Sequence, residues 1–222
     1  MPAPDPARSR SALQRSSIAV VTLGLFAPYL IFCAIMTGTP GPNNAMVLAS
    51  GVRVGVRRSL PLVFGIAAGV GLHLAAVGLG VSAVIKTIPS LYLVLKVAGV
   101  FYLFYLAYKI ATSGPVRTDA SAPPPLGFWG GVAFQWANPK SWAIGTSAVA
   151  AYVPTENYTQ GVIAAAMILS VVAVFGVGMW AVFGNALRRF LIDPRKALWF
   201  NVAMAALLLA STIPAVLTDH SN

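Results

Sequence analysis

Two short runs of polar and helix-breaking residues interrupt the apolar stretches of this sequence: 39–44 (TPGPNN) and 138–140 (NPK). Proline lacks a backbone N–H and clashes with the preceding helical turn, and the residue before it is pushed out of the α region. In hydrocarbon, unpaired backbone groups are costly, so such breaks persist only where they face protein or a wet cavity. Two breaks in corresponding positions of the two halves of a chain indicate a transport site.

Each break is expected to begin a new half-helix. Gly41 and Asn138 stand at N-cap positions, each followed by proline at the first helical position. The free N–H groups and positive dipole end would attract an anion, and Lys140 adds a full charge. Carbonyls of the preceding half-helices, which end near Gly38 and Ala137, could receive an ammonium. Together the breaks suit a zwitterion; the alternative is a pair of proline kinks that serve only packing. The candidate substrate-binding residues are Pro40, Gly41, Pro42, Asn43, Asn44, Asn138, Pro139, Lys140 and Lys96.

Two further side chains within apolar stretches can carry charge. Lys96 lies in the third stretch, where it either joins the site or extends its ammonium to the membrane surface. His73 is the only group in the second stretch that titrates near neutral pH, which makes it the candidate for proton coupling. The alternative is a neutral histidine hydrogen-bonded across helices. All five acidic residues fall in predicted loops or tails, so a neutral amino acid suits the site better than a cationic one.

The composition shows which elements must position these residues. Of the 222 residues 58% are hydrophobic and only 9% are charged, with a mean hydropathy of +0.78. Soluble domains are about a quarter charged, so this composition predicts a multi-pass, all-α membrane protein. The net charge of +10 is assigned to short loops that fix topology rather than to nucleic-acid binding. The chain shows no cluster of side chains with metal-ligand spacing, and no metal or other cofactor is expected.

Six apolar stretches predict six transmembrane helices, of which the first and fourth are broken at the proline motifs. They span residues 18–52, 60–85, 91–110, 127–152, 159–183 and 198–217. Three helices in each half place the halves in opposite orientations, as in an inverted repeat. The expected organisation is a disordered basic arm (1–17), one transmembrane domain (18–217) and a tail (218–222). Within that domain, 18–110 and 126–217 form the two repeats and 111–125 the loop between them.

Several motifs together resemble the LysE/RhtB family of amino-acid exporters. The resemblance rests on residues 39–43 (TPGPN), 95–99 (LKVAG), 102–109 (YLFYLAYK) and 134–140 (FQWANPK), in the family's order. It implies an exporter of amino acids or related metabolites in the bacterial inner membrane, driven by the proton motive force and often homodimeric. It also places functional weight on Pro40, Gly41, Pro42, Asn43, Asn138, Pro139 and Lys140.

Other functions fit the sequence less well. An enzyme would need a placed nucleophile, an acid/base pair or a metal, and the apolar stretches offer none of these. The main alternative is an anion-permeable channel or an efflux pump for other small metabolites, since Lys96 and Lys140 supply positive charge. Substrate identity, stoichiometry and oligomeric state do not follow from the sequence.

Overall fold

The computed structural model describes residues 26–81, 97, 101, 104–105, 107–112 and 126–210. Every regular element in these residues is a helix. The predicted arm (1–17), Lys96 and the tail (218–222) lie outside the described residues, as do most of the third apolar stretch and of the loop between the predicted repeats.

The first apolar stretch is a broken helix, as predicted. A helix spans Phe26–Gly38, residues 39–41 are not helical, and α2 (Pro42–Ala76) begins with Gly41 as its N-cap. Proline at the first helical position needs no N–H partner and has the backbone angle that a helix requires. The break therefore lies at the predicted residues.

The long helix α2 folds back on itself at Gly55. This residue has φ 78° and ψ 174°, a conformation that is essentially restricted to glycine. The hydroxyls of Ser50 and Ser59 lie 2.6 Å apart, whereas a straight helix would separate these residues by about 13 Å along its axis. Residues 42–54 and 56–76 are thus two helical segments, and the turn between them coincides with the predicted boundary between the first two spans. A short π-helical turn, η1 (Val77–Val81), extends the second segment.

A side chain at Gly55 is expected to destabilise this turn. Gly55→Ala should lower the free energy of unfolding by about 1–2 kcal/mol, because an L side chain is strained at this φ and ψ. Gly55→Asn should be no better, since asparagine tolerates the left-handed helical region but not this one. Thermal unfolding of the purified variants in detergent measures the effect. An unchanged unfolding temperature for both variants would contradict the assigned backbone conformation.

The second broken helix consists of α5 (Phe128–Ala137) and α6 (Pro139–Tyr152). Between them Asn138 adopts an extended conformation, φ −91° and ψ 108°, as expected for a residue before proline. The chain continues through α7 (Tyr158–Leu187), a 3₁₀ turn η2 (Phe190–Ile192) and α8 (Pro194–Ala210). Among the described residues, Tyr158–Leu187, with 30 residues, is long and apolar enough to cross a membrane. The stretch Pro42–Gly78, with 37 residues, also qualifies by length and composition, but the turn at Gly55 divides it into two segments.

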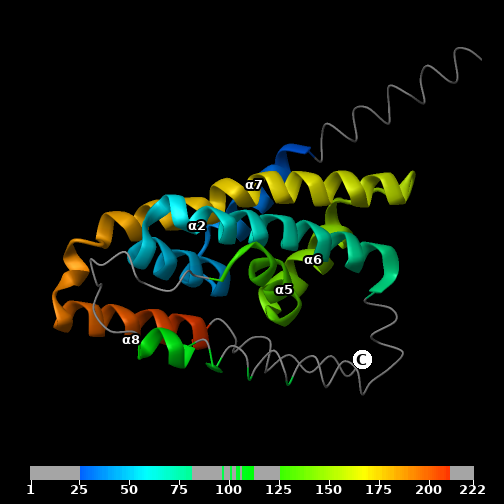
Figure 1. The fold of residues 1–222 in the computed structure, drawn as a ribbon. Coiled ribbons are helices and arrows are strands. Elements are labelled where there is room, and N and C mark those ends of the chain that lie inside the picture. Colours follow the sequence, from blue (N-terminus) through cyan, green and yellow to red (C-terminus); the bar gives the residue numbers. More distant parts are fainter. Residues whose placement is uncertain are drawn as a thin grey trace, which may run out of the picture.

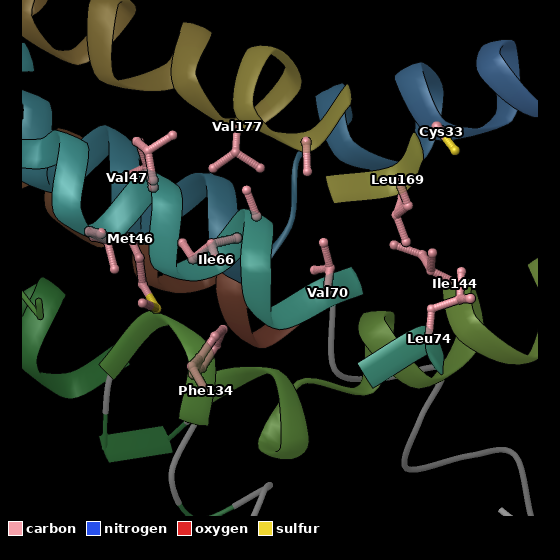
Figure 2. Close-up of a cluster of buried hydrophobic side chains, with 14 of the residues drawn as sticks. Cys33, Met46, Val47, Ile66, Val70, Leu74, Phe134, Ile144, Leu169 and Val177 are labelled. Atoms are coloured by element: carbon pink, nitrogen blue, oxygen red, sulfur yellow. The ribbon is translucent and has the colours of Figure 1, made fainter. Parts of the chain in front are cut away.

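The helix α2 is the centre of the packing, with α7 running along it and α5 and α6 on another side (Figure 1). Small residues allow close approach at these crossings. A Cβ at Gly51 would overlap the backbone of Ala181 in α7, and one at Gly65 would overlap that of Phe128 in α5. Figure 2 shows the apolar core between these helices, with Val47, Ile66 and Val70 of α2 near Val177 of α7 and Phe134 of α5. The core therefore holds the two broken helices in place.

Candidate functional site

The two breaks, about a hundred residues apart in the sequence, lie against each other. The Lys140 ammonium, at the start of α6, donates hydrogen bonds to three oxygens of the first break. These are the Thr39 carbonyl at 3.0 Å, the Thr39 hydroxyl at 2.9 Å and the Pro40 carbonyl at 3.4 Å. Thr39 and Pro40 precede the N-cap of α2, so their carbonyls lie outside its hydrogen-bond ladder. The first break therefore presents acceptors to a cation held by the second.

A reciprocal pair of side-chain amides joins the same two regions. Asn43 donates to Gln135 Oε1 at 3.0 Å, and Gln135 donates back to Asn43 Oδ1 at 3.0 Å. Ser141 also donates to Gln135 Oε1, at 2.7 Å. Gln135 is completely buried, and its amide nitrogen also bonds the Gly131 carbonyl at 3.0 Å. No role is predicted from the sequence for Gln135, Ser141 or Thr39. One feature of the sequence could have indicated Gln135: it is an uncharged polar residue in an apolar stretch, three residues before Asn138.

The asparagines of the breaks satisfy backbone groups that the interrupted helices leave open. Asn138 caps α6 by accepting a hydrogen bond from the Lys140 N–H at 3.1 Å. Asn44 donates to the carbonyls of Thr37 at 2.9 Å and Thr39 at 2.6 Å. These bonds fix the orientation of both amides. Among the described residues, Asn44 Oδ1 and Asn138 Nδ2 are buried without a hydrogen-bond partner. Each break thus has one side-chain atom that could still form a hydrogen bond, an acceptor on Asn44 and a donor on Asn138.

Gly41 gives the Lys140 side chain its path to the first break. A Cβ added at Gly41 would lie 3.1 Å from Lys140 Cδ and 3.3 Å from its Nζ. The lysine stem therefore crosses a position that has no side chain. Pro40 is exposed at the break, while Pro42 and Pro139 begin α2 and α6. The prolines thus shape the backbone of the site, and the Lys140 stem lies against Gly41.

His73 lies beside the second break. Its ring contacts Trp136 and Trp142, which precede and follow that break in the sequence. The imidazole contacts Trp142 edge to face, with ring centroids 4.4 Å apart, and Trp136 with centroids 5.2 Å apart. The side chain is 1% exposed, and neither ring nitrogen has a hydrogen-bond partner among the described residues. The hydrogen bond across helices that was the alternative role for His73 is therefore not found in this part of the chain.

A small cavity adjoins the first break. It measures about 10 Å³, enough for about one water molecule. Its polar lining comes from Thr37, Gly41, Asn43, Asn44 and Lys140, and its apolar lining from Met36, Val70, Ile144 and Val177. Ligand sites commonly measure about 300–1,000 Å³. This cavity is thus too small for an amino acid, which could enter it only after an opening movement.

The structure brings together most of the predicted site residues. Pro40, Gly41, Asn43, Asn44, Asn138 and Lys140 surround the two breaks, with His73 adjacent. In the described residues there is no group of three or more histidine, cysteine or acidic side chains that could hold a metal. Converging acceptors, donors and one ammonium can bind a small polar solute.

A known protein family matches most of this chain. The chain belongs to the LysE type translocator family, which matches residues 34–216. The family and the names of its members indicate a membrane transporter.

Its relatives include a protein named cysteine/O-acetylserine efflux protein. The one from Escherichia coli O139:H28 is 30% identical over 191 residues, which cover 85% of this chain and 96% of the relative. The one from Escherichia coli K12 is 30% identical over 190 residues, with 85% and 95% coverage. No solved structure matches this chain.

Proposed function

We propose that this protein exports a neutral amino acid, or a related small zwitterion, from the cytoplasm across the bacterial inner membrane. The observation that carries this proposal is the contact between Lys140 and the carbonyls of the first break, because it brings two polar interruptions to one place. The names of the relatives favour the same class of substrate, since cysteine and O-acetylserine are both α-amino acids without a charged side chain.

Recognition would divide between the two breaks. Acceptors gather at the first one: the carbonyls of Thr39 and Pro40, and Asn44 Oδ1. The second break supplies donors: Asn138 Nδ2, which has no hydrogen-bond partner among the described residues, and Lys140, whose ammonium extends to the first break. An α-ammonium fits the acceptors and an α-carboxylate fits the donors. The described residues that line the cavity include no carboxylate, which favours a neutral over a cationic side chain in the substrate.

We propose further that two inverted repeats of three helices move against each other to give alternating access. The packing at the breaks supports this. A glycine of α7 packs against the first break, where a Cβ at Gly176 would meet Thr37. A glycine of α2 packs near the second, where a Cβ at Gly69 would lie 2.8 Å from Gln135. The helix α7 of the second predicted half thus packs close to the first break. Residues 56–76 of the first predicted half likewise pack close to the second break.

The direct test is counterflow in proteoliposomes. Vesicles preloaded with L-cysteine under reducing conditions should take up external labelled L-cysteine through the wild-type protein. Empty liposomes and vesicles preloaded with betaine, which lacks a primary ammonium, serve as controls. Failure of the wild type to exchange cysteine, O-acetylserine or any other neutral amino acid would refute the proposed function. A steady ionic current without exchange would support the anion channel instead.

His73 is the proposed proton-coupling residue. We expect His73→Gln to reduce uptake driven by a pH gradient at least about tenfold, because glutamine has a similar size but carries no titratable proton. Exchange of substrate for substrate should continue, because it moves no net protons. The measurement compares gradient-driven accumulation with counterflow in the same proteoliposomes. Loss of both activities in a correctly folded variant would mean that His73 serves the structure of the second break instead.

A further inference from the structure

We propose that the Lys140 ammonium occupies the position that the substrate ammonium takes during transport, so that lysine and substrate exchange places at the first break. This proposal rests on the proposed function and adds a role for one residue. Lys140 would act as a built-in competitor for the ammonium site and, once displaced, as the partner of the substrate carboxylate.

The composition of the site matches an ammonium group. An –NH₃⁺ group has three donors and no acceptor. Lys140 Nζ meets three oxygens, from the Thr39 carbonyl, the Thr39 hydroxyl and the Pro40 carbonyl, at 2.9–3.4 Å. We call these three oxygens the ammonium site. The α-ammonium of an amino acid carries the same three donors, so the same oxygens can receive it.

Lysine and substrate cannot both occupy this site, because Lys140 Nζ already meets all three of its oxygens. The adjoining cavity measures about 10 Å³, far below the volume of an amino acid, and Lys140 forms part of its wall. The lysine stem lies over Gly41, where only a hydrogen atom stands beneath it. Withdrawal of this flexible stem would open the space above the start of α2. A substrate thus gains room only as Lys140 leaves.

The second break offers Lys140 a new partner. Asn138 Nδ2 is buried without a hydrogen-bond partner among the described residues, and it lies two residues from Lys140. A carboxylate bound there would accept from Asn138 and from the displaced ammonium. The exchange keeps charges balanced, because one ammonium replaces another at the first break and a carboxylate neutralises the one that left. A transported solute therefore needs both groups, and an amine without a carboxylate would have to displace Lys140 uncompensated.

The experiment compares three probes that differ by one group. L-Cysteine carries both charges, cysteamine lacks the carboxylate, and 3-mercaptopropionate lacks the ammonium. Dissociation constants are measured on the full-length protein in lipid nanodiscs, with a reductant present, for the wild type and Lys140→Met. Methionine keeps packing against Gly41 but is one atom shorter than lysine and leaves the ammonium position empty.

We expect Lys140→Met to bind cysteamine at least about tenfold more tightly than the wild type, because the competing ammonium is gone. It should bind 3-mercaptopropionate at least about tenfold more weakly, because the carboxylate has lost its partner. The wild-type preference for cysteine over cysteamine should fall accordingly. Unchanged or weaker cysteamine binding in Lys140→Met would overturn the proposal.

A second measurement covers a variant that is too unstable for titration. Methylammonium chloride should raise the unfolding temperature of Lys140→Met, since a ligand that binds the folded state stabilises it. Sodium chloride at equal concentration should not raise it. The unfolding temperature of the wild type should change equally with both salts, through ionic strength alone. No selective rise with methylammonium would also overturn the proposal. These binding and unfolding results test the role of Lys140. The proposed function is tested separately, by the exchange of cysteine through the wild-type protein.

Discussion

Gln135→Leu is expected to reduce substrate exchange at least about tenfold while the protein still inserts into the membrane. Leucine has nearly the volume of glutamine but no polar atoms. The change removes the oxygen that accepts from both Asn43 Nδ2 and the Ser141 hydroxyl, together with the donor to Asn43 Oδ1. Each buried polar group left without a partner costs about 1–3 kcal/mol. Without this pair the N-terminal turn of α2 loses its amide link to the second break.

Counterflow and thermal unfolding in the same preparation measure this effect. Gln160→Leu is the matched control, because Gln160 is an exposed glutamine in the first turn of α7 and should change neither quantity. A double variant, Asn43→Gln with Gln135→Asn, keeps one amide on each side and should recover part of the lost stability. Normal exchange by Gln135→Leu would show that the amide pair has no part in holding the transport site.

The location of the breaks could be predicted because it depends on local chemistry. Proline at residues 42 and 139 has no N–H to donate, and the residues before it, Gly41 and Asn138, take non-helical angles. Gly38 and Ala137 were expected as the ends of the preceding half-helices, and the structure confirms both. The turn at Gly55 was predicted only as a boundary between spans, because the basic residues around it indicate a loop but not its backbone angles.

The contacts between the breaks could not be predicted, because periodicity carries no information about which side chains meet. Free carbonyls were expected at the first break. Instead, Asn44 donates to two of them and Trp180 of α7 donates to the Gly38 carbonyl at 3.0 Å. Lys140 was expected to add positive charge to an anion site at the helix ends, and the sequence did not indicate that its ammonium contacts the opposite break. Each of these bonds joins residues whose approach depends on the packing of α2, α6 and α7.

The same packing makes Gly184 of α7 sensitive to enlargement. Gly184→Ala should lower the free energy of unfolding by about 3 kcal/mol, even though alanine is the better helix former. The reason is that an added Cβ would overlap the Leu48 carbonyl oxygen and lie 3.0 Å from the Val52 nitrogen. Both atoms belong to backbone, so the methyl group can be accommodated only if the two helices separate, and overpacking of this kind costs about 1–3 kcal/mol or more.

Gly178→Ala provides the control within the same helix, since its Cβ would meet only a Val63 methyl group at 3.7 Å, an ordinary contact. That variant should be neutral or more stable by up to about 1 kcal/mol, from helix propensity alone. Thermal unfolding in detergent compares the two. Exchange should also fall in Gly184→Ala, because the helix that separates carries Asn43 and Asn44 at its other end. Equal stability of the two variants would mean that the close contact between residues 42–54 and α7 does not hold the first break in place.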